Sequence, residues 1–293
     1  KNILKIVLKI FNKLSSLLKK KKDILYIDSE EDWSLFKNSV ENENIVGIDT
    51  EFDWRTTYLP ILCLIQLSTK DRIFLLDCNN LKSFKNLKKI LESDSIMKIF
   101  HSIRSDSTVL SNCLDISLEN VFDIQQAEKV LTQGEILSYG AIVKKYKSIS
   151  LDKSETNSNW LRRPLSDKQI SYAAEDVNYL IEIFYLQKKV LSNNEFQKAL
   201  NFSNKESSLG KENLGKLRLI KKKNKLSKRE QEIFIWRESI AKDNNVPPNY
   251  IFKEKYISSL AKYSDKNKSE YRKSLLKIIG DSKYVEEFII KFV

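Results

Sequence analysis

The first residues that could carry chemistry are two acids at the end of an apolar run. Asp49 and Glu51 follow the segment IVGI, which has the composition of a buried strand. Side chains alternate between the faces of a strand, so both carboxylates should project from one face and Thr50 from the other. Carboxylates this close repel each other unless a cation lies between them. Oxygen ligands without clustered sulfur or imidazole favour Mg²⁺ or Mn²⁺ over Zn²⁺. Such pairs also occur on ordinary protein surfaces, so this pair alone does not define a site.

Two further acids and a tyrosine could join this pair in a folded chain. Asp106 follows the apolar run KIF where a helix should begin, and it could also act only as a cap of that helix. Tyr172 and Asp176 are four residues apart in a helical pattern, which places both side chains on one helix face. Ser166 precedes this pattern and is a suitable N-cap.

The segments that would position these residues alternate between strand and helix patterns over residues 23–192. Runs of strand length occur at Ile24–Ile27, Ile45–Asp49, Leu62–Leu67, Ile73–Asp77 and Met97–His101. Helical patterns cover Glu30–Val40, Leu81–Leu91, Ser105–Leu114, Ile124–Leu131, Ile136–Tyr146 and a long stretch, Asp167–Leu191. This alternation predicts one α/β domain with a mixed or parallel sheet.

The segments on either side of this domain show no strand pattern. Residues 193–215 are rich in Asn, Ser and Gly and are predicted to form a linker with room for a short helix. Residues 216–293 show successive helical patterns, with a turn at Pro247 and Pro248, and are predicted to form a small all-α domain. Residues 1–22 have the pattern of a basic amphipathic helix, too interrupted by Lys to span a bilayer. We expect this helix to contact the protein itself or a partner, or else an anionic membrane surface.

Charge and rare residues narrow the class of function. The net charge is +12, with +8 on residues 1–22, +10 on residues 216–293 and −6 between them. Basic flanks around an acidic centre suit an enzyme that holds cations and binds a polyanion, although an A+T-rich coding sequence would also enrich Lys. Three well-separated cysteines indicate reduced thiols and a cytoplasmic protein, not a disulfide framework or a zinc site. One histidine, His101, and no G-x-S-x-G pattern argue against a Ser-His-Asp hydrolase.

Three segments carry a resemblance to a known family. IVGIDTEFDWRTTYLPILCLIQLS, KIFHSIRSDSTVL and LDKSETNSNWLRRPLSDKQISYAAEDVNYL resemble, in order, the three sequence blocks of ribonuclease D, in the tyrosine-containing subclass of the DEDD exonuclease superfamily. The match covers roughly residues 24–190. LSKREQEIFIWRESIAKDNNVPPNYIFKEKYISSLAK is similar to the helical HRDC domain that follows the nuclease in that family. The resemblance implies an RNase H-like fold for the first domain.

The resemblance also implies a mechanism. Asp49, Glu51, Asp106 and Asp176 would bind two divalent cations, Mg²⁺ or Mn²⁺, and Tyr172 would orient the attacking water. The reaction would remove nucleoside 5′-monophosphates from the 3′ end of RNA, with tRNA precursors as expected substrates. A phenol ordinarily has a pKa of about 10, so hydrogen bonding is a better role for Tyr172 than acting as a base.

Several residues near these blocks are candidates for contact with the substrate, each with a structural alternative. An aromatic ring could stack on a terminal base or pack in the core; a histidine could touch substrate or make structural hydrogen bonds; arginines and lysines could contact phosphates or remain solvated. The candidates are Phe52, His101, Arg162, Arg163, Lys221, Lys222 and Lys223. Asp123 is predicted to cap a helix, not to bind metal.

Three other functions are compatible with parts of this pattern. A DNA 3′-5′ exonuclease would use the same acids, because ribose preference depends on contacts with the 2′-OH that the sequence does not show. A catalytically inactive nucleic-acid-binding protein would keep the basic segments, but retention of all four acids and the tyrosine argues against it. A membrane-associated nuclease would use the helix predicted over residues 1–22.

Overall fold

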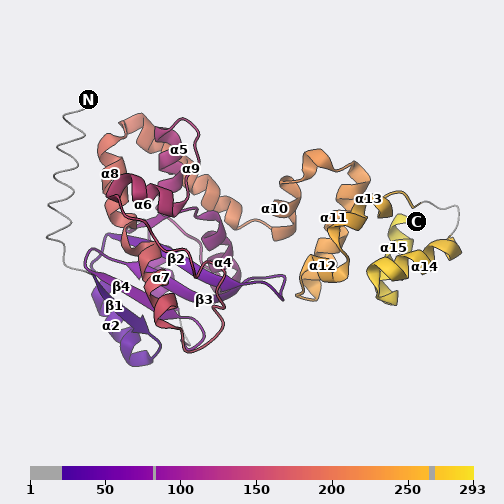
Figure 1. Cartoon of the computed structure of the whole chain (residues 1–293), viewed down its shortest axis with the longest axis horizontal. Helices are drawn as coiled ribbons and strands as arrows, with labels where there is room; N and C mark the ends of the chain where they lie inside the picture. Colours follow the sequence, from indigo (N-terminus) through magenta and orange to yellow (C-terminus); the bar gives the residue numbers. More distant parts are fainter. Residues whose placement is uncertain (1–21, 82–83, 264–267) are drawn as a thin grey trace. The chain divides into compact units, whose positions relative to one another are not determined.

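The computed structural model describes residues 22–81, 84–263 and 268–293, and the chain divides into two compact units (Figure 1). The first unit contains the described residues up to Phe52 together with Leu62–Lys211, and the second contains Asp53–Ile61 together with the described residues from Glu212 to Val293. The helix predicted over residues 1–22 lies outside the described residues except for Lys22. In the part of the chain that the structure describes, no helix is both long enough and apolar enough to cross a membrane.

A six-stranded sheet forms the centre of the first unit, in the order β1-β4-β3-β2-β5-β6. Strand β1 runs parallel to β4, β4 antiparallel to β3, β5 parallel to β2 and β6 parallel to β5. The strands are β1 (Asp23–Ile27), β2 (Ile45–Asp53), β3 (Ile61–Ser68), β4 (Arg72–Asp77), β5 (Met97–Phe100) and β6 (Val121–Asp123). The predicted α/β fold with a mixed sheet is confirmed.

Helices cover both faces of this sheet because its strands bury side chains on both sides. In β3, Ile65 and Leu67 join one core and Leu64 joins the other. The first core takes its helical side chains from α2 (Glu30–Val40), α3 (Lys85–Leu91) and α4 (Arg104–Leu114). The second takes them from α5 (Ile124–Leu131), α6 (Tyr139–Lys147), α7 (Asp167–Asn178), α8 (Leu180–Val190) and α9 (Asn193–Gly210). Continuous apolar runs in the sequence therefore correspond to strands buried on both faces.

The long helix predicted over Asp167–Leu191 is in fact two helices, α7 and α8, that meet at Tyr179. The hydroxyl of Tyr139 accepts a hydrogen bond from the Tyr179 amide (3.3 Å) and donates one to the Glu175 carbonyl (3.2 Å). These two backbone groups would have bonded to each other in an uninterrupted helix. A side chain from a distant segment is thus inserted into the helical ladder, which is a recognised cause of a break.

Residues 193–215 differ most from expectation, because most of them form a helix and not a linker. Helix α9 spans 18 residues and begins with a capping box between Ser192 and Glu195. Its small residues pack against α4 and β6 of the same unit: a Cβ on Gly210 would come within 2.7 Å of the Arg104 carbonyl, and the Ser203 hydroxyl accepts a bond of 2.8 Å from the Asp123 amide. Gly and Ser are present here because the helix packs closely, so their loop-like composition misled the prediction.

The second unit is helical, and its core is rich in aromatic residues. Its helices are α10 (Leu214–Ile220), α11 (Lys228–Asp243), α12 (Pro248–Ile251), α13 (Ile257–Leu260), α14 (Lys268–Ile279) and α15 (Ser282–Phe292). Two single-turn 3₁₀ helices, η1 (Lys223–Lys225) and η2 (Glu254–Tyr256), lie between them. The Trp236 ring packs edge-on against Phe288 and Phe292, with centroids 5.4 and 5.8 Å away. Pro247 lies between α11 and α12, where the turn was predicted. Pro248 is the first residue of α12.

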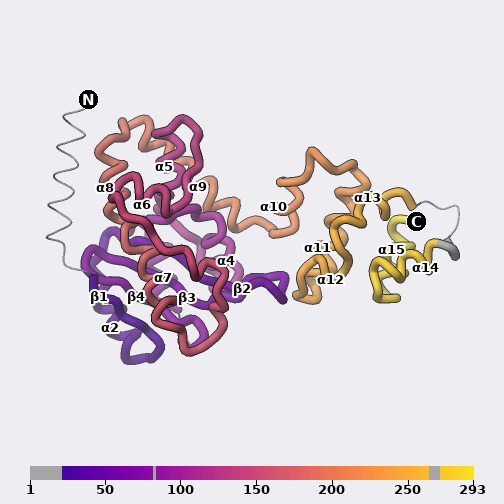
Figure 2. The backbone as a smooth tube through the Cα atoms, in the orientation of Figure 1, coloured from indigo at the N-terminus to yellow at the C-terminus, as the bar shows by residue number. Residues whose placement is uncertain are grey.

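A short segment between two strands of the sheet also belongs to the second unit. Figure 2 follows the backbone out of β2 through residues 53–61 and back into β3. Tyr58 in this segment is only 2% exposed and packs in the aromatic core of the second unit. The amides of Tyr58 and Leu59 both donate to the Asn245 side-chain oxygen, at 3.2 Å. The second unit is therefore not a contiguous stretch of chain.

Candidate active site

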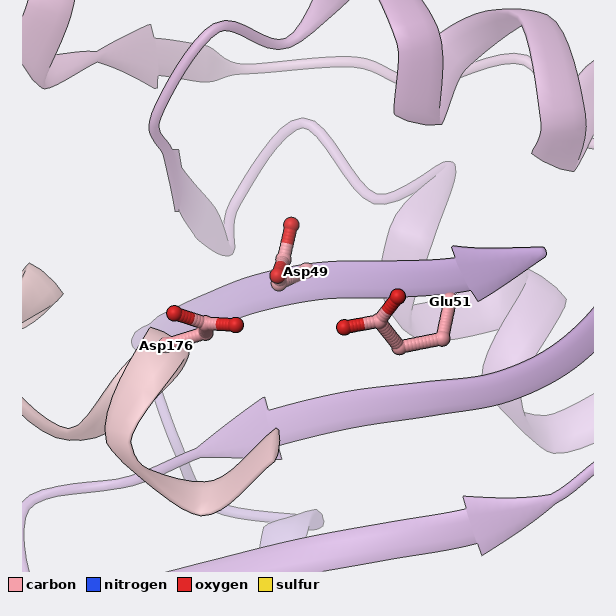
Figure 3. Close-up of side chains that lie close together, drawn as sticks. All are labelled: Asp49, Glu51 and Asp176. Carbon is pink, nitrogen blue, oxygen red and sulfur yellow. The ribbon is translucent and has the colours of Figure 1, made fainter. Parts of the chain in front are cut away.

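Three carboxylates from two distant segments converge on the face of the sheet that α7 covers. Asp49 and Glu51 project from β2, and Asp176 projects from α7 toward them (Figure 3). One oxygen from each of the three lies within 4.8 Å of the others. The alternation predicted for β2 is present, because Thr50 is directed to the other side, where it is buried. This is the only group of three or more potential metal-ligating side chains among the residues described.

Close packing at the end of α7 brings Asp176 to the strand. The Ser68 hydroxyl on β3 donates to the Val177 carbonyl at 2.8 Å, which ties this helix to the sheet. Gly47 on β2 leaves space for this contact, since a Cβ there would lie 2.5 Å from the Ser68 hydroxyl and 3.0 Å from the Leu180 Cβ. Glycine is therefore needed two residues before Asp49 for packing, and not for backbone freedom.

The fourth predicted acid, Asp106, lies outside the group of three. It is in the first turn of α4, 4% exposed, and accepts a hydrogen bond of 2.6 Å from the Thr50 hydroxyl. It is nevertheless close enough for its charge to raise the pKa of both Asp49 and Glu51. The structure thus places Asp106 beside the acid-bearing strand, electrostatically linked to the other acids.

All four carboxyl groups are more difficult to ionise than free acids. Burial and the neighbouring carboxylates raise the pKa of Glu51 to about 9 and hold that of Asp49 well above its ordinary range. Burial also raises the pKa of Asp106 and of Asp176 to about 7, although hydrogen bonds from Thr50 and Tyr172 oppose part of each shift. Like charges gathered in a buried site need a counter-ion to be ionised together, so this group of side chains fits a divalent cation.

A buried amide lies on the same side of the sheet as the acids. Gln66 on β3 is completely buried, and neither atom of its amide has a hydrogen-bond partner among the described residues. It shares a strand face with Ser68, and therefore lies on the α7 side of the sheet in the strand next to β2. Buried amides normally have partners. The acids supply only oxygen ligands, the set that Mg²⁺ and Mn²⁺ accept together with water.

Tyr172 lies one helical turn before Asp176 on α7. Its hydroxyl is 3.2 Å from the Thr156 hydroxyl, and its ring centroid is 6.0 Å from that of Trp160. Burial raises the pKa of Tyr172 above its ordinary value, and the charges of Asp176 and Glu51 raise it further. The phenol therefore stays protonated at neutral pH and can act as a hydrogen-bonding group. Sequence reasoning missed Thr156, because an exposed threonine in a loop gives no signal of its own.

Comparisons with known proteins place this site in a family. Residues 24–191 match the model of a 3′-5′ exonuclease family, and residues 227–286 match that of the HRDC domain. The chain belongs to this 3′-5′ exonuclease family. It is 32% identical to the ribonuclease D of Desulfotalea psychrophila over 249 residues, and 32% identical to that of Bartonella henselae over 250 residues. Each alignment covers 80% of this chain, but only 66% and 60% of those relatives.

Solved structures show the same fold. Escherichia coli RNase D, described as an exoribonuclease involved in structured RNA processing, superposes with a TM-score of 0.76 at 24% identity, over 93% of this chain and 75% of that one. Trypanosoma brucei RNase D in complex with RNA U12 superposes with a TM-score of 0.59 at 19% identity, over 66% and 72%. The resemblance to ribonuclease D and the C-terminal HRDC domain is confirmed.

In this member of the family, Arg163 is not available as the phosphate contact that the sequence suggested. Its guanidinium donates twice to the Asp77 carboxylate, at 2.7 Å each, and also to the carbonyls of Trp160, Arg162 and Cys63. These bonds use all five N–H groups of the side chain. Arg163 therefore anchors the loop before α7 to β4. The prediction for Arg162, which is exposed, stays a prediction.

Two other residues predicted to contact substrate, Phe52 and His101, have structural contacts in this chain. Phe52 packs against the first core, on the other face of the strand from Glu51. The His101 ring lies 3.1 Å from the Leu137 carbonyl and 5.6 Å from the Tyr139 ring centroid, and burial lowers its pKa. These contacts favour the structural alternatives over contact with substrate. Asp123 caps α5 as predicted, accepting a bond from the Gln125 amide.

The lysines predicted to contact phosphates lie in the second unit. Lys221 and Lys223 are exposed, and Lys222 forms an ion pair with Glu254. Lys221 and Lys222 line a cavity, whereas Lys223 does not.

Proposed function

We propose that this chain is a divalent-cation-dependent 3′-5′ exoribonuclease of the ribonuclease D type, which removes nucleoside 5′-monophosphates from RNA 3′ ends. The observation that carries the proposal is the convergence of three partly buried carboxylates from β2 and α7 within 4.8 Å. Family membership, the relatives named ribonuclease D and the tyrosine one turn from Asp176 support it. From the resemblance to ribonuclease D we expect tRNA precursors as substrates.

The proposed site binds two cations through Asp49, Glu51, Asp176 and Asp106, with Mg²⁺ or Mn²⁺ favoured by the all-oxygen ligand set. A pair of such ions supplies an activated water and offsets charge on the departing oxygen. Tyr172, held beside Thr156, orients that water by hydrogen bonding while remaining protonated.

We further propose a division of labour along the chain. Residues 23–192 would carry out hydrolysis, with the following helix α9 as part of the same unit. Residues 216–293 would attract RNA through their basic side chains, including Lys221, Lys222 and Lys223. Such contacts are independent of sequence and weaken as salt concentration rises.

The test uses the full chain with a tRNA precursor labelled at its 3′ or its 5′ end, and a single-stranded DNA of matched sequence. We expect mononucleotides to be released from the 3′ label and the release to stop in EDTA. Asp176→Asn and Asp106→Asn should each lower the rate by at least about 10³-fold, the scale of losing a catalytic group. Asp167→Asn is the matched control, because Asp167 is an exposed acid on the same helix as Asp176.

Each contrary result identifies an alternative. Faster hydrolysis of the DNA than of the RNA would make the chain a DNA exonuclease. RNA binding without mononucleotide release from either strand would make it an inactive binding protein. Full activity of Asp176→Asn would reject the assigned site.

A further inference from the structure

The second unit contains a cavity of about 230 Å³ with an unusual lining. Arg218 and Lys221 reach it from α10 and the residue after it, and Arg237 reaches it from α11. Lys222 adds a fourth cation, and the two acids of the lining are Glu238 and Glu254. Cations therefore outnumber acids two to one around this cavity.

Arg237 is the least explained residue of this lining. Its side chain is only 3% exposed, yet its Nε and Nη1 atoms have no hydrogen-bond partner among the residues described. Nη2 is 3.5 Å from a Glu238 oxygen and 3.7 Å from a Glu254 oxygen, both beyond a good charge-assisted bond. The guanidinium lies near the rings of Phe234 and Phe252, 5.1 and 5.5 Å from their centroids. Buried donors without acceptors are costly, and the Nε and Nη1 groups of this guanidinium have none among the residues described.

The two acids approach only the Nη2 group of Arg237, and other cations engage the second oxygen of each acid. A Glu238 oxygen accepts a bond of 2.8 Å from Arg218, and Glu254 is paired with Lys222. Lys221 is exposed at the rim, and no ion pair is seen for it within the described parts of the chain. The cavity thus has one buried, unsatisfied guanidinium and one free ammonium group. This arrangement favours an anion with several oxygens, for which a guanidinium fork has the right geometry.

We propose that this cavity binds a phosphate group, held by the guanidinium of Arg237 and by the ammonium of Lys221. In naming RNA as the source of the phosphate, the proposal rests on the proposed function. A phosphate within an RNA strand and the phosphate of a free mononucleotide share the same chemistry. The aromatic rings and ion pairs around Arg237 hold the guanidinium in place before binding.

The test measures binding to the full chain by isothermal titration calorimetry in EDTA, where the proposed hydrolysis cannot occur. The probes are inorganic phosphate, uridine 5′-monophosphate and a short oligouridylate. Lys221→Gln and Arg237→Lys should each weaken binding about tenfold, the usual effect of losing a charge-assisted hydrogen bond. Lys70→Gln is the matched control, because it removes the same charge from an exposed lysine of the first unit that does not line the cavity.

The comparison between Lys221→Gln and Lys70→Gln decides the outcome. If Lys221→Gln weakens all three probes, the cavity recognises a phosphate group from either source. If it weakens only the oligouridylate, the cavity holds a phosphate within the RNA strand. Equal effects of both substitutions, or no effect of either, would overturn the proposal in favour of diffuse attraction.

Two precautions keep the result clear. Arg237 is buried, so Arg237→Lys is used only if its circular dichroism and unfolding midpoint match those of the wild type. The exposed Lys221 decides the question if Arg237→Lys does not fold. Because binding is measured without catalysis, an inactive nuclease site would leave this result unchanged, and loss of phosphate binding would leave the nuclease assignment intact.

Discussion

Protonation is the simplest way for the candidate site to be stable without metal. Its carboxyl groups are buried and close together, which raises the pKa of Glu51 to about 9 and those of Asp106 and Asp176 to about 7. In an unfolded chain these groups ionise near pH 4. Between these pH values the folded protein therefore holds protons that the unfolded chain has released, and folding becomes coupled to pH.

The sign of this coupling gives the first prediction. Because the unfolded state binds fewer protons than the folded state above about pH 4, the free energy of unfolding should fall as pH rises from 5 to 9. Thermal unfolding of the metal-free protein should show this decline, and Mg²⁺ or Mn²⁺ should restore stability most at high pH. Glu51→Gln should flatten the metal-free profile. A profile that rises over this range in the metal-free wild type would contradict the prediction.

Gln66 gives a second prediction, since its buried amide has no partner among the described residues. Replacing it with an apolar side chain of similar length removes a desolvated polar group. Gln66→Met should therefore raise the free energy of unfolding of the metal-free protein by about 1–3 kcal/mol. Gln187→Met is the control with the opposite sign, because the Gln187 amide, also buried, donates to Ile124 and Glu128 at 2.9 and 3.1 Å. Urea titrations would show the two shifts, and a loss of stability in both variants would refute the argument.

Tyr172 gives a third prediction, about catalysis. Tyr172→Phe removes the hydroxyl that lies beside Thr156 but keeps the ring beside Trp160. If the hydroxyl orients water, kcat should fall about 10²-fold while KM changes little, the expected effect of misplacing a reacting group. Tyr185→Phe, on an exposed position of α8, should leave both constants unchanged. A change in KM alone would assign Tyr172 to substrate binding.

At the scale of elements, the sequence predicted what depends on local pattern. The five strands β1 to β5 are long apolar runs, and α2, α5 and α6 have clear helical patterns, so each was found close to its observed position. Strand β6 has only three residues and gave no pattern. The break between α7 and α8 depends on Tyr139, a residue far away in sequence. Helix α9 looked like a linker because its buried residues are small.

In the candidate site, too, the sequence predicted the local features and not the long-range contacts. The alternation of Asp49 and Glu51 and the helical spacing of Tyr172 and Asp176 are local features, and the structure shows both. The sequence could not predict that Arg163 donates its hydrogen bonds to Asp77, because Asp77 lies 86 residues away. Long-range partners decide whether a charged side chain is structural or free, and one sequence does not reveal them.

Helix α9 gives the fourth prediction, which tests whether its small residues are needed for packing. A Cβ on Gly210 would lie 2.6 Å from the Ser107 Cβ and 2.7 Å from the Arg104 carbonyl, so the backbone of α4 or α9 would have to move. Gly210→Ala should lower the free energy of unfolding by about 1–3 kcal/mol, as overpacking does. Ser208→Ala, exposed on the same helix, should change it by less than about 0.5 kcal/mol. Equal stability of both variants would show that α4 and α9 can move apart at Gly210 without a loss of stability.

At the scale of the molecule, the chain that leaves the strand bearing two of the acids contributes a residue to the core of the second unit. β2 ends at Asp53, and five residues later Tyr58 is buried among the aromatic side chains of that unit. The Arg218 guanidinium lies 4.8 Å from the Tyr58 ring centroid, a cation–π contact. The second unit therefore depends on a residue that lies in sequence between β2 and β3, two strands of the sheet of the first unit.

This dependence gives the last prediction. Tyr58→Ala should remove a fully packed ring from the second unit and lower its stability by about 3–5 kcal/mol, the usual cost of truncating a buried aromatic residue. Hydrogen exchange followed by mass spectrometry should show faster exchange of the α11 and α15 amides, with α5 and α8 protected as in the wild type. Tyr58→Phe, which keeps the ring, should leave α11 protected. Faster exchange in α5 and α8 to the same degree would mean that the two units unfold together, because the lost core would then be shared and not local.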